Sequence, residues 1–162
     1  THYAGWQAFQ SVRNALLPGR SAGHRDLVPR VTFLDPEVAH VGLTEERARA
    51  RYSDVEVHRW PMDRVDRAAA DGETAGFLKL VARSGGRLLG ATAIAARAGE
   101  IIGELALALQ RRMTISDIAG TIHAYPTWST PVQQLSGDAA VAQFKSGLTG
   151  RLALRLAGLG RG

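Results

Sequence analysis

The sequence has 162 residues, and its 45% hydrophobic and 22% charged residues are typical of one globular domain. It contains no cysteine, which excludes disulfides, thiolate catalysis and cysteine metal sites within the chain. Its formal net charge of +5 is compatible with nucleic acid or an anionic membrane as a partner. No apolar run is long enough to span a bilayer and no signal peptide is recognisable, so we expect a cytoplasmic protein.

Hydrophobic periodicity and turn residues divide the chain into regular and irregular segments. The first half contains a helix over residues 5–17, strands over 30–34 and 38–42, a short helix to about residue 52 and a strand over 54–62. A loop or a wide hairpin excursion over 63–75 follows. The second half contains strands over 76–83 and 87–95, a helix over 99–112, and helices that begin near residues 116 and 131. Pro18 ends the first helix, and Asp35-Pro36 forces a bend between the first two strands. Thr44 is placed to cap the short helix that follows.

The clearest pair of strands lies in the middle of the chain. Residues 76–83 and 87–95 are joined by Ser-Gly-Gly, which is a strong signal for a β-hairpin. The helix over residues 99–112 then places its apolar side chains on one face. Antiparallel strands with helices grouped apart predict an α+β fold, in which helices pack on an antiparallel β-sheet.

Residues 137–162 are interpreted as a basic amphipathic C-terminal tail. Four leucines share one face of a predicted helix, and two arginines lie elsewhere on it. They are Leu148, Leu152, Leu156 and Leu159, and Arg151 and Arg155. Such a helix is typical of a membrane-surface or partner-binding segment. The alternative is a loosely packed terminal helix with solvated arginines, because the glycines around it weaken a helix.

Complete motifs for cofactor or metal chemistry are absent from the sequence. There is no G-x-G-x-x-G after a strand, no Walker A pattern and no H-E-x-x-H, so no metal site is predicted. Glu100 and Glu104 lie one helical turn apart, and a carboxylate pair can perform acid–base chemistry. The alternative for this pair is a solvated or interface-facing edge of the helix.

Three segments nevertheless resemble a known module in their order and spacing. They are "VPRVTFLDPEVAHVGLTEERA" at residues 28–48, "GFLKLVARSGGRLLGATAIAARAGEIIGELALAL" at residues 76–109 and "IHAYPTWST" at residues 122–130. Together they resemble the C-terminal dimerisation domain of FAD-dependent pyridine nucleotide-disulfide oxidoreductases. The resemblance covers roughly residues 28–135, and "THYAG" at the start is similar to the family's helix after the FAD domain.

The resemblance implies a three-part enzyme, with an FAD domain, an NAD(P) domain and this interface domain. It implies the family's dimerisation-domain fold over residues 27–136, with residues 1–26 as the remnant of a junction with a missing FAD domain. The implied partner is a second copy of the chain, whose active site this domain completes in trans. FAD and NAD(P) are expected in the full-length parent, whereas this fragment alone is expected to bind no cofactor and to be inactive.

The segment "IHAYPTWST" departs from the family pattern at two positions. In disulfide-reducing members it resembles His-x-His-Pro-Thr-x-x-Glu, in which the second histidine is the thiol acid–base and the glutamate orients it. Tyr125 stands at that histidine and Thr130 at that glutamate, while His123 keeps the first histidine. The resemblance therefore gives Tyr125 and His123 as candidate catalytic residues. It places Pro126 and Thr127 near the partner subunit's flavin.

A phenol is a poor base at neutral pH, so the acid–base dyad of the family is absent here. We expect a mercuric reductase-like or soluble transhydrogenase-like parent rather than a lipoamide or glutathione reductase. Each motif residue also has a structural alternative: Tyr125 can pack at the dimer seam, and His123 can be a hydrogen-bonded structural residue.

Two other functions are alternatives. A stand-alone basic module would bind an anionic membrane or nucleic acid through its tail, although the strands lack the stacking aromatic residues of RNA-binding sheets and we expect no nucleic acid. An independent enzyme would use Glu100 and Glu104 or His123, and it would need a pocket that holds them together.

Overall fold

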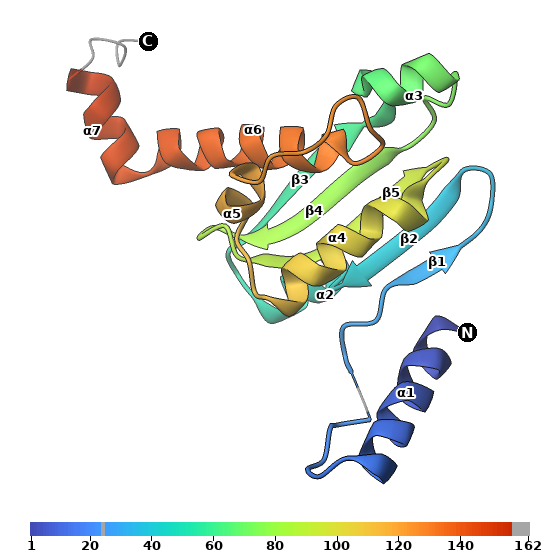
Figure 1. Ribbon diagram of the computed structural model, residues 1–162. Coiled ribbons are helices and arrows are strands. Elements are labelled where there is room, and N and C mark those ends of the chain that lie inside the picture. Colours follow the sequence, from blue (N-terminus) through green and yellow to red (C-terminus); the bar gives the residue numbers. More distant parts are fainter. Residues whose placement is uncertain (24, 157–162) are drawn as a thin grey trace.

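The computed structural model describes residues 1–23 and 25–156, with an antiparallel sheet of five strands at the centre (Figure 1). The strands are β1 (Arg30–Thr32), β2 (Glu37–Gly42), β3 (Val55–Pro61), β4 (Phe77–Arg83) and β5 (Leu88–Ala95). They are arranged in the order β1-β2-β5-β4-β3, so β5 lies in the middle and β1 and β3 form the edges. The predicted α+β fold, with helices packed on an antiparallel sheet, is confirmed.

The two helices α4 (Ala98–Gln110) and α6 (Thr130–Ser146) cover one face of this sheet (Figure 1). The described helices are α1 (His2–Leu16), α2 (Glu45–Arg51), α3 (Asp66–Asp71), α4 (Ala98–Gln110), α5 (Ile115–Ala119), α6 (Thr130–Ser146) and α7 (Leu148–Leu156), with a 3₁₀ helix at Met62–Arg64. α4 lies over β5 and β2, while α6 packs against α5 and β3 (Figure 1). None of the helices in this described part of the chain has the length and apolar character needed to cross a membrane.

The core forms where the alternating side chains of the strands meet these helices. Ala39, Leu78 and Ala93 occupy directly opposed positions on three neighbouring strands, so their side chains point to the same face. They share one buried cluster with Ile101 of α4 and Val132 of α6. Each fully buried leucine, isoleucine or valine side chain stabilises the fold by about 1.5–3 kcal/mol. The small alanines of β5 leave room for α4 to approach the sheet.

The prediction of a loop over residues 63–75 is wrong, because this stretch contains α3. Its helical turn is fixed to the core through Val65 and Ala68, which are buried. Gly72 ends the helix in a left-handed conformation, with φ of 74°, and Glu73 then donates its N–H to the carbonyl of Ala68. Six residues are too few for apolar periodicity to reveal a helix in the sequence.

The two ends of the described chain extend beyond this sheet (Figure 1). Helix α1 stands apart from the sheet and leaves Phe9, Val12 and Leu16 exposed. Helix α6 is continuous across residues 136 and 137, where the tail was predicted to begin.

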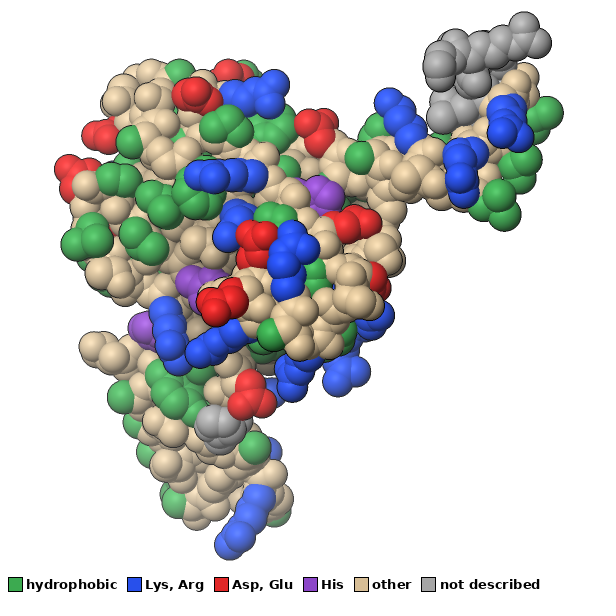
Figure 2. All heavy atoms as spheres, turned by 180° about the vertical axis from the view of Figure 1, so that it is seen from behind, with side chains coloured by type: hydrophobic (Ala, Val, Ile, Leu, Met, Phe, Trp, Pro, Cys, Tyr) green, Lys and Arg blue, Asp and Glu red, His purple; other side chains and the backbone are tan. Residues whose placement is uncertain are grey.

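Helix α7 projects from the end of α6, and Figure 2 shows hydrophobic and basic side chains side by side at this end. Leu148, Leu152 and Leu156 are exposed there. The rest of the predicted tail, including Leu159, lies outside the described residues.

Candidate functional site

The motif at residues 122–130 starts from a well-capped helix. The hydroxyl of Thr114 accepts the N–H of Asp117, and the carboxylate of Asp117 accepts the N–H of Thr114 at 2.7 Å, so α5 begins with a capping box. The hydrogen bond from the Thr114 N–H, followed by the bond from its hydroxyl, holds the pKa of Asp117 below its usual value. Thr121 donates its hydroxyl to the carbonyl of Asp117 at 3.1 Å. The motif therefore leaves α5 from a fixed point.

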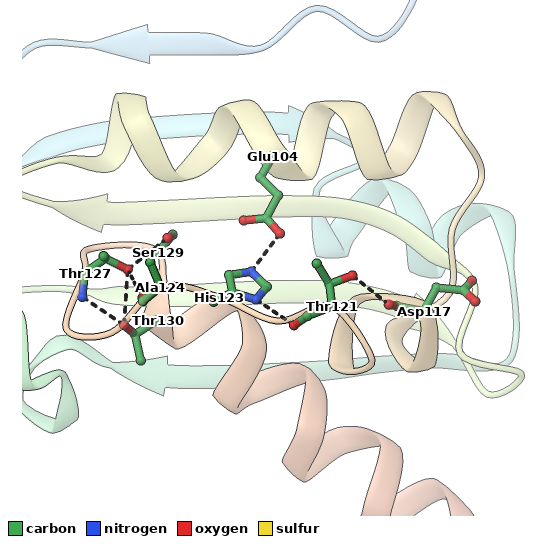
Figure 3. Close-up of polar contacts among 8 residues, drawn as sticks. All are labelled: Glu104, Asp117, Thr121, His123, Ala124, Thr127, Ser129 and Thr130. Carbon is green, nitrogen blue, oxygen red and sulfur yellow. Dashed lines mark hydrogen bonds and ion pairs between the residues drawn. The ribbon is translucent and has the colours of Figure 1, made fainter.

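Hydroxyl groups close the second half of the motif into a tight turn (Figure 3). Thr127 donates its hydroxyl to the carbonyl of Ala124 at 2.8 Å, and its N–H donates to the hydroxyl of Thr130 at 3.1 Å. The Ser129 hydroxyl lies 3.1 Å from that of Thr127, and Thr130 is buried at the start of α6. The peptide bond between Tyr125 and Pro126 is cis. The polar groups of Thr127 are thus used within the motif itself.

His123 ties the first half of the motif to α4. Its Nδ1 lies 2.9 Å from the carbonyl oxygen of Thr121, and its Nε2 lies 2.8 Å from Oε1 of Glu104 (Figure 3). The His123 side chain is only 6% exposed. Because a carbonyl oxygen can only accept a hydrogen bond, Nδ1 is the donor to Thr121. Both nitrogens of His123 are therefore bonded within the chain.

Tyr125 has a different environment, because its side chain is exposed to 68%. Its hydroxyl donates to Oδ2 of Asp66, in the first turn of α3. That hydrogen bond, together with the negative charge of Asp66, raises the pKa of Tyr125 above its ordinary value. The phenol accordingly keeps its proton at neutral pH and is unable to take a proton from a thiol.

Trp128 is the second aromatic residue of the motif that α3 holds. Its Nε1 donates to Oδ2 of Asp71 at 3.1 Å, and Asp71 also accepts a hydrogen bond from Nε of Arg67 at 2.9 Å. The Trp128 ring is half-buried and packs against the main core cluster. Tyr125 and Trp128 are thus bonded to the two ends of the same short helix.

The residues expected near a flavin line a shallow cavity between the motif and α3. The cavity has a volume of about 330 Å³ and is lined by Pro126, Thr127, Trp128, Arg67, Asp71 and Arg97. Over residues 1–23 and 25–156, no group of three or more histidine, aspartate or glutamate side chains could hold a metal ion. Two arginines and one aspartate thus lie beside Pro126, Thr127 and Trp128 in this cavity.

Sequence reasoning did not find Asp66 and Asp71, and it considered Glu104 only together with Glu100. Glu104 was paired with Glu100 by its spacing, but the structure joins it to His123 and leaves Glu100 exposed. Asp66 and Asp71 lie in the segment predicted as a loop, and their bonds to the motif join residues 57 and 59 positions apart. The only signal in the sequence was the alanine run between Asp66 and Asp71, which favours a helix.

The family model described as "Pyridine nucleotide-disulphide oxidoreductase, dimerisation domain" matches residues 28–135. A mercuric reductase of Shewanella putrefaciens is 45% identical over 101 residues, which cover 62% of this chain and 18% of that protein. A dihydrolipoyl dehydrogenase of Geobacillus stearothermophilus is 45% identical over 112 residues, which cover 65% of this chain and 24% of that protein. The chain thus spans about a quarter or less of the length of these relatives.

Solved structures with the same fold agree with this match. One is the copper(II) complex of the HOCl-induced flavoprotein disulfide reductase RclA from Escherichia coli, with a TM-score of 0.78 and 28% sequence identity. The match covers 85% of this chain and 32% of the RclA chain. LpdA from Mycobacterium tuberculosis has a TM-score of 0.71 and 28% identity, over 80% of this chain and 28% of that one. Since the family match includes every strand of the sheet and the whole motif, the chain belongs to the pyridine nucleotide-disulphide oxidoreductases, and residues 28–135 are its dimerisation domain.

Proposed function

We propose that this domain joins two copies of an FAD- and NAD(P)-dependent oxidoreductase, and that residues 122–130 complete the partner subunit's active site. The proposal is supported by the family match and by relatives named mercuric reductase and dihydrolipoyl dehydrogenase. FAD and NAD(P) supply hydride transfer when bound to such a protein. A mercuric reductase-like parent in the cytoplasm is the form of the proposal that the sequence favours.

One observation carries the proposal: the motif is internally fixed but presents large side chains outward. Ile122 is exposed to 93% and Tyr125 to 68%, although hydrogen bonds hold the segment on both sides of them. An exposed aliphatic and an exposed aromatic side chain on one fixed segment suit a surface that a partner covers. A second copy of the chain is the partner that a dimerisation domain provides.

The two candidate catalytic residues have different parts in this proposal. Tyr125 is the group that meets the partner's site, since its ring is exposed and the raised pKa keeps its hydroxyl protonated. His123 is a positioning residue, because both ring nitrogens are bonded to Thr121 and Glu104. Pro126 and Thr127 shape the turn beside the partner's flavin, since the N–H and hydroxyl of Thr127 are used within the motif.

Sedimentation of the chain tests the dimer. The chain should be dimeric at micromolar concentration, and Ile122→Asp should make it monomeric, because a carboxylate would be buried at the interface without a partner. Leu16→Asp is the matched control, since Leu16 is also exposed but lies outside the family match. A monomeric wild-type chain, or equal effects of the two substitutions, contradicts the proposal.

Family membership disfavours the alternative of a stand-alone basic module. Removing the residues after Phe144 would abolish binding to anionic vesicles or nucleic acid if the tail were the functional part. We expect such a truncation to leave the motif and its contacts with α3 and α4 intact, because these lie entirely before α7.

A further inference from the structure

Helix α3 contacts the motif at two points, one at each end of the helix. Asp66 in its first turn accepts the hydroxyl of Tyr125, and Asp71 at its end accepts the indole N–H of Trp128 at 3.1 Å. The two bonded pairs lie three residues apart in the motif and five apart in α3. Two hydrogen bonds at this spacing fix the directions of both aromatic side chains, which one bond alone would not do.

Helix α3 is itself anchored firmly enough to act as a support. Met62, Val65 and Ala68, in and next to this helix, are buried in the main core cluster. The N–H of Met62 donates to the carbonyl of Gly76 at 3.1 Å, which ties the segment to the start of β4. Because core side chains hold this short helix, residues bonded to it keep a fixed position relative to the sheet.

We infer that Asp66 and Asp71 are positioning residues: Asp66 orients Tyr125 toward the partner subunit's active site, and Asp71 fixes Trp128 beside it. This inference rests on the proposed function for its consequence, but the orientation itself is a property of this chain alone. The exposed Tyr125 ring has no other hydrogen-bond partner for its hydroxyl hydrogen among the described contacts. Without Asp66 the hydroxyl would rotate freely in solvent.

The direction of the Tyr125–Asp66 hydrogen bond also selects what Tyr125 can bind. Because the phenol hydrogen points to Asp66, the remaining lone pairs of the oxygen face outward and can only accept a hydrogen bond. The nearby carboxylate adds negative charge, which disfavours an anion and favours a donor or a cation. Tyr125 therefore fits a protonated group, such as a thiol S–H or an N–H, rather than a thiolate.

The test compares two substitutions on α3 that remove the same type of charge. Asp66→Asn should shift the titration of Tyr125 to lower pH, since the carboxylate that raises its pKa is lost. Asp71→Asn should leave that titration unchanged and alter the fluorescence of Trp128 instead. NMR of the tyrosine rings in the dimeric chain measures the titration, and Tyr125→Phe and Trp128→Phe identify the two signals. Equal titrations in wild type and Asp66→Asn overturn the inference.

Activity of the full-length protein separates this inference from the proposed function. Asp66→Asn should lower kcat/KM as much as Tyr125→Phe does, Asp66→Glu should restore part of it, and the alkaline limb of the Asp66→Asn pH profile should move to lower pH. A merely structural role for Asp66 would not move that limb. If the NMR titration shifts but Tyr125→Phe retains full activity, the role of Tyr125 at the partner's site is overturned while its positioning by Asp66 stands.

Discussion

Nε2 of His123 lies 2.8 Å from Oε1 of Glu104, so a side chain of the motif is joined to the helix that covers the centre of the sheet. The histidine side chain is 6% exposed and the glutamate side chain 34%. The pair lies between the motif and α4, away from the positions of Tyr125 and Thr130 in the sequence. Its place within the fold suits it to holding the motif, because no ring nitrogen is left for a substrate.

Removing the carboxylate of this pair should therefore loosen the motif. Glu104→Ala leaves the buried Nε2 of His123 without a partner, which we expect to cost about 1–3 kcal/mol of unfolding free energy. Glu100→Ala is the matched control, one turn earlier on the same helix and exposed, and it should change stability by less than about 0.5 kcal/mol. Urea unfolding of the three proteins measures both differences. Equal effects would show that the bond to His123 contributes nothing.

Thr130 gives a second prediction, because it is buried and the resemblance assigns it to the position of the family's glutamate. Thr130→Val should cost about 1 kcal/mol, since the N–H of Thr127 loses its acceptor. Thr130→Glu should cost considerably more, on the order of several kcal/mol, because a carboxylate enters a buried site without a partner. Thermal unfolding compares the two. If Thr130→Glu is no worse than Thr130→Val, the site already has room for the family's carboxylate.

The parts of the fold that depend on local sequence were predictable. Ser-Gly-Gly between β4 and β5 forms the expected turn, with Gly86 at φ of 77°, and the hairpin around it is confirmed. Thr44 caps α2 as predicted, by accepting the N–H of Arg47 at 3.2 Å. Such features are visible because the residues that cause them are neighbours in the chain.

The features that remained hidden depend on residues far apart in the chain. Helix α3 escaped prediction because its stability comes from burying Val65 and Ala68 rather than from its own periodicity. The bonds of Glu104 to His123 and of Asp66 to Tyr125 require the sheet to bring separate helices together. The motif residues indicated a site in the sequence, but nothing in the sequence showed that Glu104, Asp66 and Asp71 bond to it.

Glycines provide a prediction about backbone geometry. Gly76 precedes β4 with φ of 109°, and a Cβ at this position would lie 1.9 Å from the carbonyl oxygen of Ile94. Gly76→Ala should therefore destabilise the domain by at least about 1–3 kcal/mol from backbone strain alone. Gly103 in α4 is exposed with open space around its Cβ position, so Gly103→Ala should stabilise it by about 0.5–1 kcal/mol. Denaturant unfolding gives both values, and a tolerated Gly76→Ala would contradict the geometry.

The ion pair between Asp54 and Arg83 gives a prediction about pH. Nε of Arg83 lies 3.1 Å from both carboxylate oxygens of Asp54 and joins the start of β3 to the end of β4. This hydrogen bond lowers the pKa of Asp54 below its ordinary value of 3.8. A carboxyl group whose pKa is lowered by folding adds stability above its unfolded pKa, and this stability is lost as the pH falls through the folded pKa.

Wild type should consequently be more stable than Asp54→Asn at neutral pH, and the difference should shrink as the pH falls below about 4 toward the pKa of the folded state. Urea unfolding of both proteins at a series of pH values measures it. Arg83→Gln supplies the control, because in that background Asp54→Asn should no longer change the dependence of stability on pH in this range. A difference that stays constant down to low pH would show that the effect of Asp54→Asn does not come from the charged form of Asp54, and would contradict the prediction.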